Sequence, residues 1–288
     1  MSKGYFRRYD TGMKASGTYT DMEGTTNPVG GVQMGQTFLN VPVEDVIYMM
    51  LHNENPPRIT GTGSCTDLNG ATVNTGQCVE VGNVLSNGKW TWTTRKGTKT
   101  LMQFSWSDYQ GTVIDDLVPV GGNGATYNYD TTGVTYTSNV DYHMSFPGFV
   151  YDGKYKVFDR PTFYFKQPYY WGVTTLTLAD WEVMSQNNQI DWINYLQPNG
   201  FKKEMVIDQP AQVAKDFTTN QERIVFLCPP SWTPFPSIFN NYNQEVLTTF
   251  RTAKVWVTGE FGVKLEYTAF ISVNATKGSY TNYFKKSK

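Results

Sequence analysis

A stretch near the C-terminus, residues 248–273, most constrains what this chain can fold into. It reads TTFRTAKVWVTGEFGVKLEYTAFISV, and apolar side chains alternate with polar ones on both sides of two glycines. A period of two places alternate side chains on opposite faces of a strand, so the stretch predicts long, half-buried β-structure. Gly259 and Gly262 fit either a hairpin turn or a β-bulge. We expect this segment in the middle of a sheet, with earlier strands paired to it.

The rest of the chain carries further strand patterns joined by loops of unequal length. KWTWTTR and TLMQFSW, on either side of KGTK, predict a β-hairpin with Trp90 and Trp92 on one face and Trp106 beside Phe104. One helical segment is expected from Asp180, which can cap it, to a stop at Pro198 and Gly200. Strands and helices do not alternate, and no period of 20–50 residues repeats, which excludes doubly wound sheets, TIM barrels, propellers and solenoids. The expected class is all-β, as a sandwich or jelly roll.

Composition and charge narrow the functional classes. Aromatic residues make up 15% of the chain and charged residues only 17%, against about 25% charged in an average soluble domain. The formal net charge is −1, with 24 Lys and Arg against 25 Asp and Glu, so the chain lacks the basic excess of a protein that neutralises nucleic acid stoichiometrically. The N-terminal residues Arg7, Arg8 and Lys14 are the best candidates for contact with nucleic acid, and solvated termini are the alternative.

The sequence shows no targeting segment. The opening residues lack an apolar core, so no secretory signal is expected, and the apolar runs are too short to span a bilayer. Three cysteines form no metal-ligand pattern. A disulfide between Cys65 and Cys78 and three reduced thiols both remain open, with reduced thiols favoured for a protein made in cytoplasm.

Signals for catalysis are weak. The two histidines, His52 and His143, lie near no nucleophile motif, and the Asp-Thr-Gly at residues 10–12 has no second copy. Asp115 and Asp116 are adjacent and therefore point to opposite faces of a strand. We expect no enzyme, no metal and no cofactor. A β-sandwich glycosidase remains a third alternative, which would need paired carboxylates converging in a groove.

Three tryptophans offer a binding alternative. If Trp90, Trp92 and Trp106 were exposed on their hairpin, they would form a platform for stacking on sugar rings or bases. If they are buried, they belong to the core or to an interface, and this interpretation is favoured because large aromatic side chains are usually buried.

The C-terminal third resembles a known group of proteins. IVFLCPPSWTPFPSIFNNYNQ is a strand that leads into a proline-rich loop, and TTFRTAKVWVTGEFGVKLEY is an alternating strand that ends in an aromatic residue. Over residues 223–267 this layout is similar to the last strands of coat proteins of small non-enveloped single-stranded DNA viruses, most nearly the parvovirus group. The resemblance implies a single jelly roll, an eight-stranded antiparallel β-sandwich with long surface loops and, here, one short helical insertion. It also implies genome packaging by a separate motor, which needs no strongly basic arm.

The resulting hypothesis is a viral capsid protein without catalysis. An extended arm over residues 1–36 would precede a jelly-roll domain over residues 37–288 that self-assembles into an icosahedral shell around single-stranded DNA. Loops at residues 61–87, 121–148 and 229–245 would form the outer surface and the symmetry contacts. Its partners would be copies of itself, the packaged DNA and a host receptor such as a glycan, with no membrane insertion. The protein would be made in the host cytoplasm, with assembly there or in the nucleus, and reside in the virion. The rival is a carbohydrate-binding, adhesion or phage tail receptor-binding module that uses the tryptophan platform.

Overall fold

The protein is predominantly β-sheet. The computed structural model describes residues 14–18, 37–43, 45–47, 56–187 and 190–286. Strands account for 52% of the chain and helices for 10%, and most strand pairs are antiparallel. The expectation of an all-β protein is therefore confirmed, and the jelly-roll connectivity stays a prediction.

Two compact units make up the chain. The first unit contains residues 1–62, 90–129 and 145–161, and the second unit contains residues 63–89, 130–144 and 162–288. Strands β3 (Arg58–Thr66) and β6 (Val84–Arg95) each run through both units. Because strands are shared between the units, the division does not by itself separate two domains, and the single domain expected over residues 37–288 stays a prediction.

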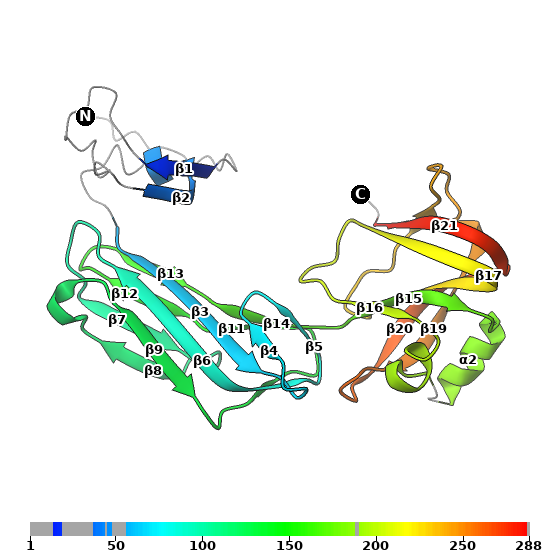
Figure 1. Ribbon diagram of the computed structural model, residues 1–288, viewed down its shortest axis with the longest axis horizontal. Helices are drawn as coiled ribbons and strands as arrows, with labels where there is room; N and C mark the ends of the chain where they lie inside the picture. Colours follow the sequence, from blue (N-terminus) through cyan, green and yellow to red (C-terminus); the bar gives the residue numbers. More distant parts are fainter. Residues whose placement is uncertain (1–13, 19–36, 44, 48–55, 188–189, 287–288) are drawn as a thin grey trace. The chain divides into compact units, whose positions relative to one another are not determined.

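The first unit is built on a four-stranded sheet with the order β13-β12-β7-β8 (Figure 1). Strand β6 belongs to a different sheet, in which it pairs with β3, β9 and β10. The remaining elements of this unit are β1 (Lys14–Thr18), β2 (Thr37–Pro42), β7 (Gln103–Ser107), β8 (Val113–Leu117), η1 (Val120–Gly122), β9 (Thr126–Thr131, whose last two residues belong to the second unit), β12 (Gly148–Tyr151) and β13 (Lys156–Asp159).

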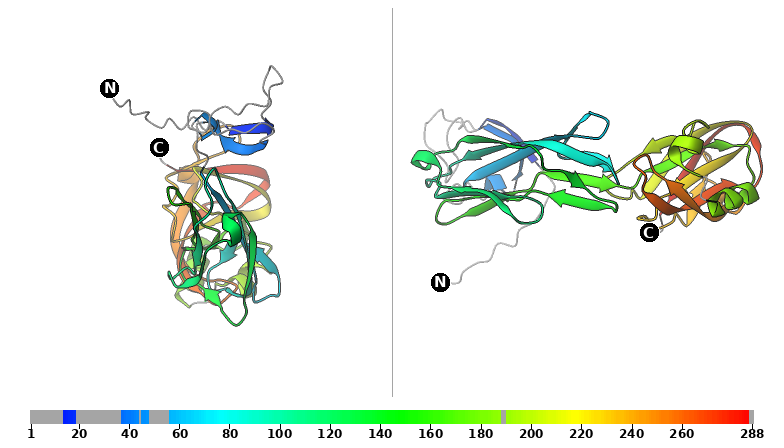
Figure 2. Two further views of the ribbon diagram at one scale, coloured as in Figure 1. Left: turned by 90° about the vertical axis from the view of Figure 1, so that its left-hand side faces the viewer. Right: turned by 90° about the horizontal axis from the view of Figure 1, so that it is seen from below.

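The expected tryptophan hairpin is wrong, because β6 and β7 lie in two sheets that face each other (Figure 2). The Trp92 ring lies 5.9 Å from the Trp106 ring and 6.1 Å from the Phe104 ring, centroid to centroid, across the interior. Trp90 and Trp92 do share one face of β6, as expected, and both are buried. Packing the two aromatic rows against each other removes both from water, whereas a hairpin would place them side by side on one surface.

All three expected long loops contain short strands, including β18 (Ser237–Phe239) within residues 229–245. Residues 61–87 include β4 (Thr72–Asn74) and β5 (Cys78–Glu80), and residues 121–148 include β10 (Tyr136–Thr137) and β11 (Tyr142–Ser145). Gly76, with φ of 89°, lies between β4 and β5, and Gly133, with φ of 82°, lies just before β10. These glycines mark turns, as expected, and the segments beside them form short strands.

The second unit is centred on a sheet with the order β16-β15-β17-β20-β19, and β21 pairs with both β17 and β18. Its other elements are β14 (Thr162–Lys166), β15 (Tyr169–Thr174), α2 (Leu178–Gln186), the π-helical turn η2 (Trp192–Leu196), β16 (Lys202–Glu204), β17 (Gln212–Cys228), β18 (Ser237–Phe239), η3 (Leu247–Thr249), β19 (Phe250–Thr258), β20 (Lys264–Ser272) and β21 (Thr276–Lys285).

The alternating stretch that opened the sequence analysis forms a hairpin. Strands β19 and β20 pair in register from Phe250 opposite Ser272 to Thr258 opposite Lys264. Gly262, with φ of 80°, lies in the turn, which decides between the two alternatives left open by the glycines. Strand β20 is interior, as expected, and is buried on both faces along its second half, whereas β19 is an edge strand.

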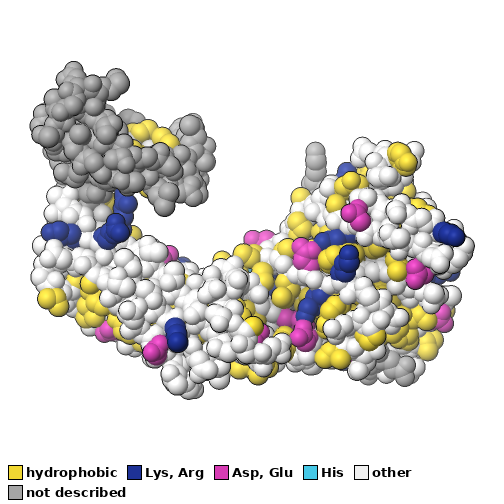
Figure 3. Space-filling view, in the orientation of Figure 1, with side chains coloured by type: hydrophobic (Ala, Val, Ile, Leu, Met, Phe, Trp, Pro, Cys, Tyr) yellow, Lys and Arg dark blue, Asp and Glu magenta, His cyan; other side chains and the backbone are white. Residues whose placement is uncertain are grey.

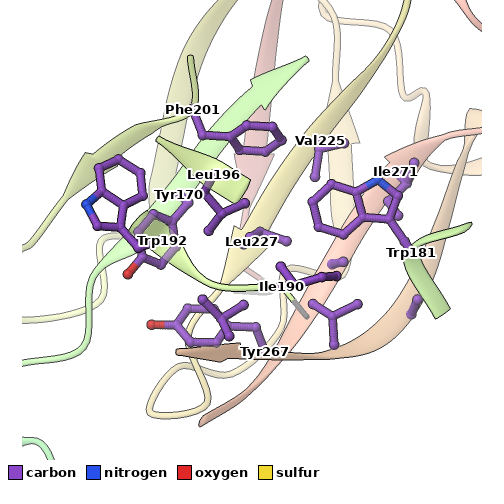
Figure 4. Packing of buried hydrophobic residues seen from close by; sticks show 14 residues of the cluster. Tyr170, Trp181, Ile190, Trp192, Leu196, Phe201, Val225, Leu227, Tyr267 and Ile271 are labelled. Atoms are coloured by element: carbon purple, nitrogen blue, oxygen red, sulfur yellow. The ribbon is translucent and has the colours of Figure 1, made fainter. Parts of the chain in front are cut away.

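Helix α2 covers one face of this sheet and contributes to its core. Trp181 is buried among residues of η2 and of β17, including Leu196 and Val225 (Figure 4). The N-cap of α2 is Thr177, and not Asp180 as expected from the sequence. The Thr177 side chain accepts a hydrogen bond from the Asp180 backbone N–H, and the Asp180 carboxylate accepts one from the Thr177 backbone N–H. This reciprocal capping box satisfies two backbone donors, which a cap by Asp180 alone would not.

The three cysteines are free. The disulfide between Cys65 and Cys78 is therefore not formed. Burial raises the pKa of Cys65 to about 12, and burial likewise raises the pKa of Cys228 to about 12. Both thiols therefore stay protonated and act as small apolar side chains.

Candidate functional site

The tryptophan platform is not at the surface. Trp90, Trp92 and Trp106 are 1%, 0% and 1% exposed, and their rings contact one another in the core of the first unit. A sugar ring or a base needs an open aromatic face for stacking. The structure therefore corrects the platform interpretation in favour of the core alternative, and it removes the feature on which the carbohydrate-binding rival depended.

The candidate nucleic-acid contacts are mostly outside the described chain. Arg7 and Arg8 lie outside the described residues. Lys14 begins β1, where its backbone pairs with Pro42 of β2. Contact between these three basic residues and nucleic acid stays a prediction.

Strand β8 is the most unusual exposed feature of the first unit. It forms one edge of the four-stranded sheet, yet Val113 and Ile114 are 57% and 42% exposed. Just beyond it, Val118 and Val120 are 72% and 95% exposed. Figure 3 shows hydrophobic side chains reaching the surface over β8 and η1. An edge strand has unpaired backbone groups, and native proteins normally protect such edges with charges, prolines or cover.

The strand register explains which side chains face outward. In the pairing of β7 with β8, Trp106 is opposite Asp115 and Ser105 is opposite Asp116. Because Trp106 faces the interior, Asp116 is on the outer face of the sheet. The Gln103 amide donates to the Asp116 carboxylate at 2.7 Å. A bulge then leaves Val113 and Ile114 together opposite the end of β7.

Asp115 has a different environment on the inner face. Its carboxylate accepts a 2.5 Å hydrogen bond from the Tyr129 hydroxyl. Burial, together with this bond and the carboxylate charge, raises the pKa of Tyr129 above its ordinary value. The two adjacent aspartates therefore point to opposite faces, as expected, and cannot act as a catalytic pair.

The opposite edge of the same sheet is β13, and it combines an aromatic ring with a cation. Phe158 is 51% exposed and lies directly opposite Phe149 of β12. The ammonium group of Lys156 lies 3.6 Å from the centroid of the Phe149 ring and 5.4 Å from that of Phe158. A lysine in this position covers aromatic surface while keeping its charge in water.

Two shallow surface depressions are lined by basic side chains. One, of about 400 Å³, lies in the first unit beside Arg95 and Lys96. The other, of about 290 Å³, lies in the second unit beside Arg223 and Arg251. Neither is lined by a carboxylate or a histidine. These depressions offer positive charge without a group for acid–base chemistry.

Glu80 and Glu260 of the second unit form a pair of carboxylates that has a structural role. Glu80 and Glu260 both bind the ammonium group of Lys203, and Glu80 also accepts a hydrogen bond from the Glu260 backbone N–H at 2.9 Å. Both Glu80 oxygens are therefore occupied by protein donors, which leaves this carboxylate no free oxygen with which to act on a substrate.

The described residues form neither a metal-ligand cluster nor a helix that could span a membrane. Among the described residues, no three His, Cys, Asp or Glu side chains gather closely enough to ligate a metal ion. Within the same part of the chain, no helix has the length and apolar character needed to cross a membrane. His143 lies in β11 and packs edge-on against the Tyr164 ring, with 5.0 Å between the ring centroids.

Sequence reasoning missed the edge strands as the candidate site. The run VIDDLVPV contains the signal, because apolar side chains occur at consecutive positions and not only at alternate ones. Such a run puts apolar groups on both faces of its strand, so at an edge some of them must reach the surface. Comparison with known protein families and with curated proteins finds no match to this chain.

Proposed function

We propose that the protein is a viral coat protein, which assembles with copies of itself into an icosahedral shell around a single-stranded DNA genome. The observation that carries the proposal is the exposed apolar surface at the edge strand β8, formed by Val113 and Ile114 in the strand and Val118 just beyond it. An exposed apolar edge promotes aggregation of a monomer, but in an assembly the neighbouring subunits cover it and its burial stabilises the contact.

The rest of the molecule supports the same function. A shell subunit needs a rigid core, and the buried aromatic clusters of both units supply one. It also needs weakly charged contact surfaces, which agrees with a chain that is only 17% charged. The DNA would meet the basic N-terminal segment, the receptor would meet outward loops, and the virion would be the site of action.

The test is negative-stain electron microscopy with size-exclusion light scattering on the purified full-length protein. We expect uniform hollow spheres of megadalton mass. Ile114→Lys should abolish them, because it places a charge in the apolar edge, whereas Val183→Lys should not. Val183 is a matched control, since it is 55% exposed on helix α2 of the second unit. A small, monodisperse species for the unmodified protein at all salt concentrations and pH values would overturn the proposal.

A further inference from the structure

The two edges of the four-stranded sheet run in opposite directions. Strands β8 and β7, β7 and β12, and β12 and β13 are all antiparallel pairs, so three reversals separate β8 from β13. A second copy in the same orientation would therefore place its β8 antiparallel to β13 of the first copy. The alternation of strand directions would continue across the boundary without a break.

We propose that β8 of one copy pairs with β13 of the next, and that this edge-to-edge joint is the contact that builds the assembly. This inference rests on the proposed function, because it names the joint through which the shell subunits associate. Each copy would offer two different edges, so the contact is heterologous. Because neighbouring strands in a sheet are rotated by about 20–25°, successive copies would turn relative to each other, and such a contact closes into a ring only where that rotation closes and otherwise extends as an open filament.

One register satisfies both the charges and the apolar groups. Lys156 and Phe158 are on the outer face, since they are opposite Tyr151 and Phe149, which in turn pair with Gln103 and Ser105. Asp116 is also on the outer face. Placing Lys156 directly opposite Asp116 of the neighbour puts Phe158 beside Ile114 at the bulge. Cross-strand ion pairs and aromatic–β-branched pairs are the favourable pairs of an antiparallel sheet.

Competing arrangements lose these pairs. Moving the neighbour by two residues in one direction sets Phe158 against Asp116, and in the other direction it sets Lys156 against Ile114. A shift by one residue reverses the faces of the whole strand. Pairing β8 with β8 of another copy gathers Asp115 and Asp116 of both strands, and like charges in opposed positions are destabilising.

Charge reversal tests the joint directly. Asp116→Lys and Lys156→Asp should each raise the concentration at which the full-length protein assembles by roughly tenfold or more. The double variant restores the opposite charges at the joint and should recover assembly. Glu182→Lys and Lys96→Asp make the same changes of charge at exposed positions away from both edges, and they should leave the assembly concentration unchanged.

Disulfide trapping provides a second readout that does not need complete shells. A mixture of Asp116→Cys and Lys156→Cys proteins should form a covalent dimer on mild oxidation, because directly opposite residues bring their Cβ atoms within reach of a disulfide. Each variant oxidised alone should form far less dimer. The unmodified protein controls for the native thiols, of which Cys65 and Cys228 are buried.

The outcomes separate the joint from the function. Shells that form in every charge variant, together with no mixed dimer, would overturn the edge pairing and leave the coat function standing. A mixed dimer without any shell would support the edge pairing and overturn the coat function. Dimers formed equally by Asp116→Cys alone would replace this joint with a symmetric β8 pairing.

Discussion

The ammonium group of Lys203 lies 2.8 Å from Oε2 of Glu80, a carboxylate that is only 2% exposed. Lys203 comes from β16 and Glu80 from β5, 123 residues apart in the chain. The second oxygen of Glu80 accepts the backbone N–H of Glu260, at the turn between β19 and β20. One buried carboxylate thus connects three segments of the second unit, and its ion pair keeps it satisfied.

Breaking this ion pair should destabilise the fold. Lys203→Met should lower the free energy of unfolding by about 3 kcal/mol, because it leaves the buried Glu80 carboxylate uncompensated, whereas Glu80→Gln should cost less, because Lys203 keeps its ion pair with Glu260. The double variant should lose less than the sum of the two. Urea unfolding followed by tryptophan fluorescence measures both. Strictly additive losses would show that the two side chains do not interact.

The same pair predicts an alkaline dependence. Burial lowers the pKa of Lys203, but the adjacent Glu80 and Glu260 carboxylates outweigh burial and hold that pKa above its ordinary value. Its stabilisation is therefore complete below the unfolded pKa of about 10.4, and it is lost as the pH rises through the higher folded value. In Glu80→Gln this alkaline loss should be smaller than in the unmodified protein.

Gly148 should be intolerant of a side chain. A Cβ at this position would lie 2.6 Å from the Trp92 ring, which is fully buried. Gly148→Ala should cost about 1–3 kcal/mol through overpacking. In a Trp92→Leu background, which has room for the added methyl group, the same substitution should cost much less. An equal cost in both backgrounds, measured by urea unfolding, would contradict the packing explanation.

The capping box of α2 predicts a modest, specific loss. Thr177→Ala should lower the free energy of unfolding by about 1 kcal/mol, whereas Thr177→Ser should leave this free energy almost unchanged, because serine can also cap the helix. Hydrogen bonds from the backbone and side chain of Thr177 lower the pKa of Asp180. The contribution of Asp180 is present above its unfolded pKa of about 3.9 and is lost as the pH falls further. Thermal unfolding at pH 7 and pH 3 should show a smaller acid loss in Thr177→Ala.

The buried thiols predict a second alkaline effect. With its pKa raised to about 12, Cys65 keeps its proton in the folded protein. The unfolded thiol ionises near pH 8.5, so stability should fall as the pH rises above that value, by about 1–2 kcal/mol at pH 10. Cys65→Ala should be less stable at pH 7 but lose less between pH 8 and pH 10. Parallel pH profiles in urea unfolding would contradict this assignment.

Local patterns predicted some of the strands, but not β21. The alternation around Val255 and Val257 correctly indicated which side chains of β19 are buried, because a period of two is intrinsic to a strand. The position of the helix near Trp181 was also correct. The predicted N-cap, Asp180, was wrong, and the N-cap is Thr177. Both residue types can cap a helix, and only the backbone conformation decides between them.

Which strands pair with each other could not be predicted from the sequence. KGTK has the composition of a hairpin turn, yet β6 and β7 belong to different sheets. A glycine in a turn lets the chain reverse, but it does not determine whether the next strand hydrogen-bonds to the previous one or crosses to the facing sheet. That choice depends on which arrangement buries Trp92 and Trp106 together.

The sequence by itself determined the all-β class, the burial alternation of the strands and the glycine-marked turns, because these follow from local geometry and side-chain chemistry. Only the tertiary structure decided that the tryptophans are core and that β8 and β13 are edges. Edge position is a property of the whole sheet: it depends on which strands find partners and which do not. For this reason the exposed apolar side chains of β8, and the lysine and phenylalanine of β13, could be recognised as a candidate binding surface only once the strands were paired.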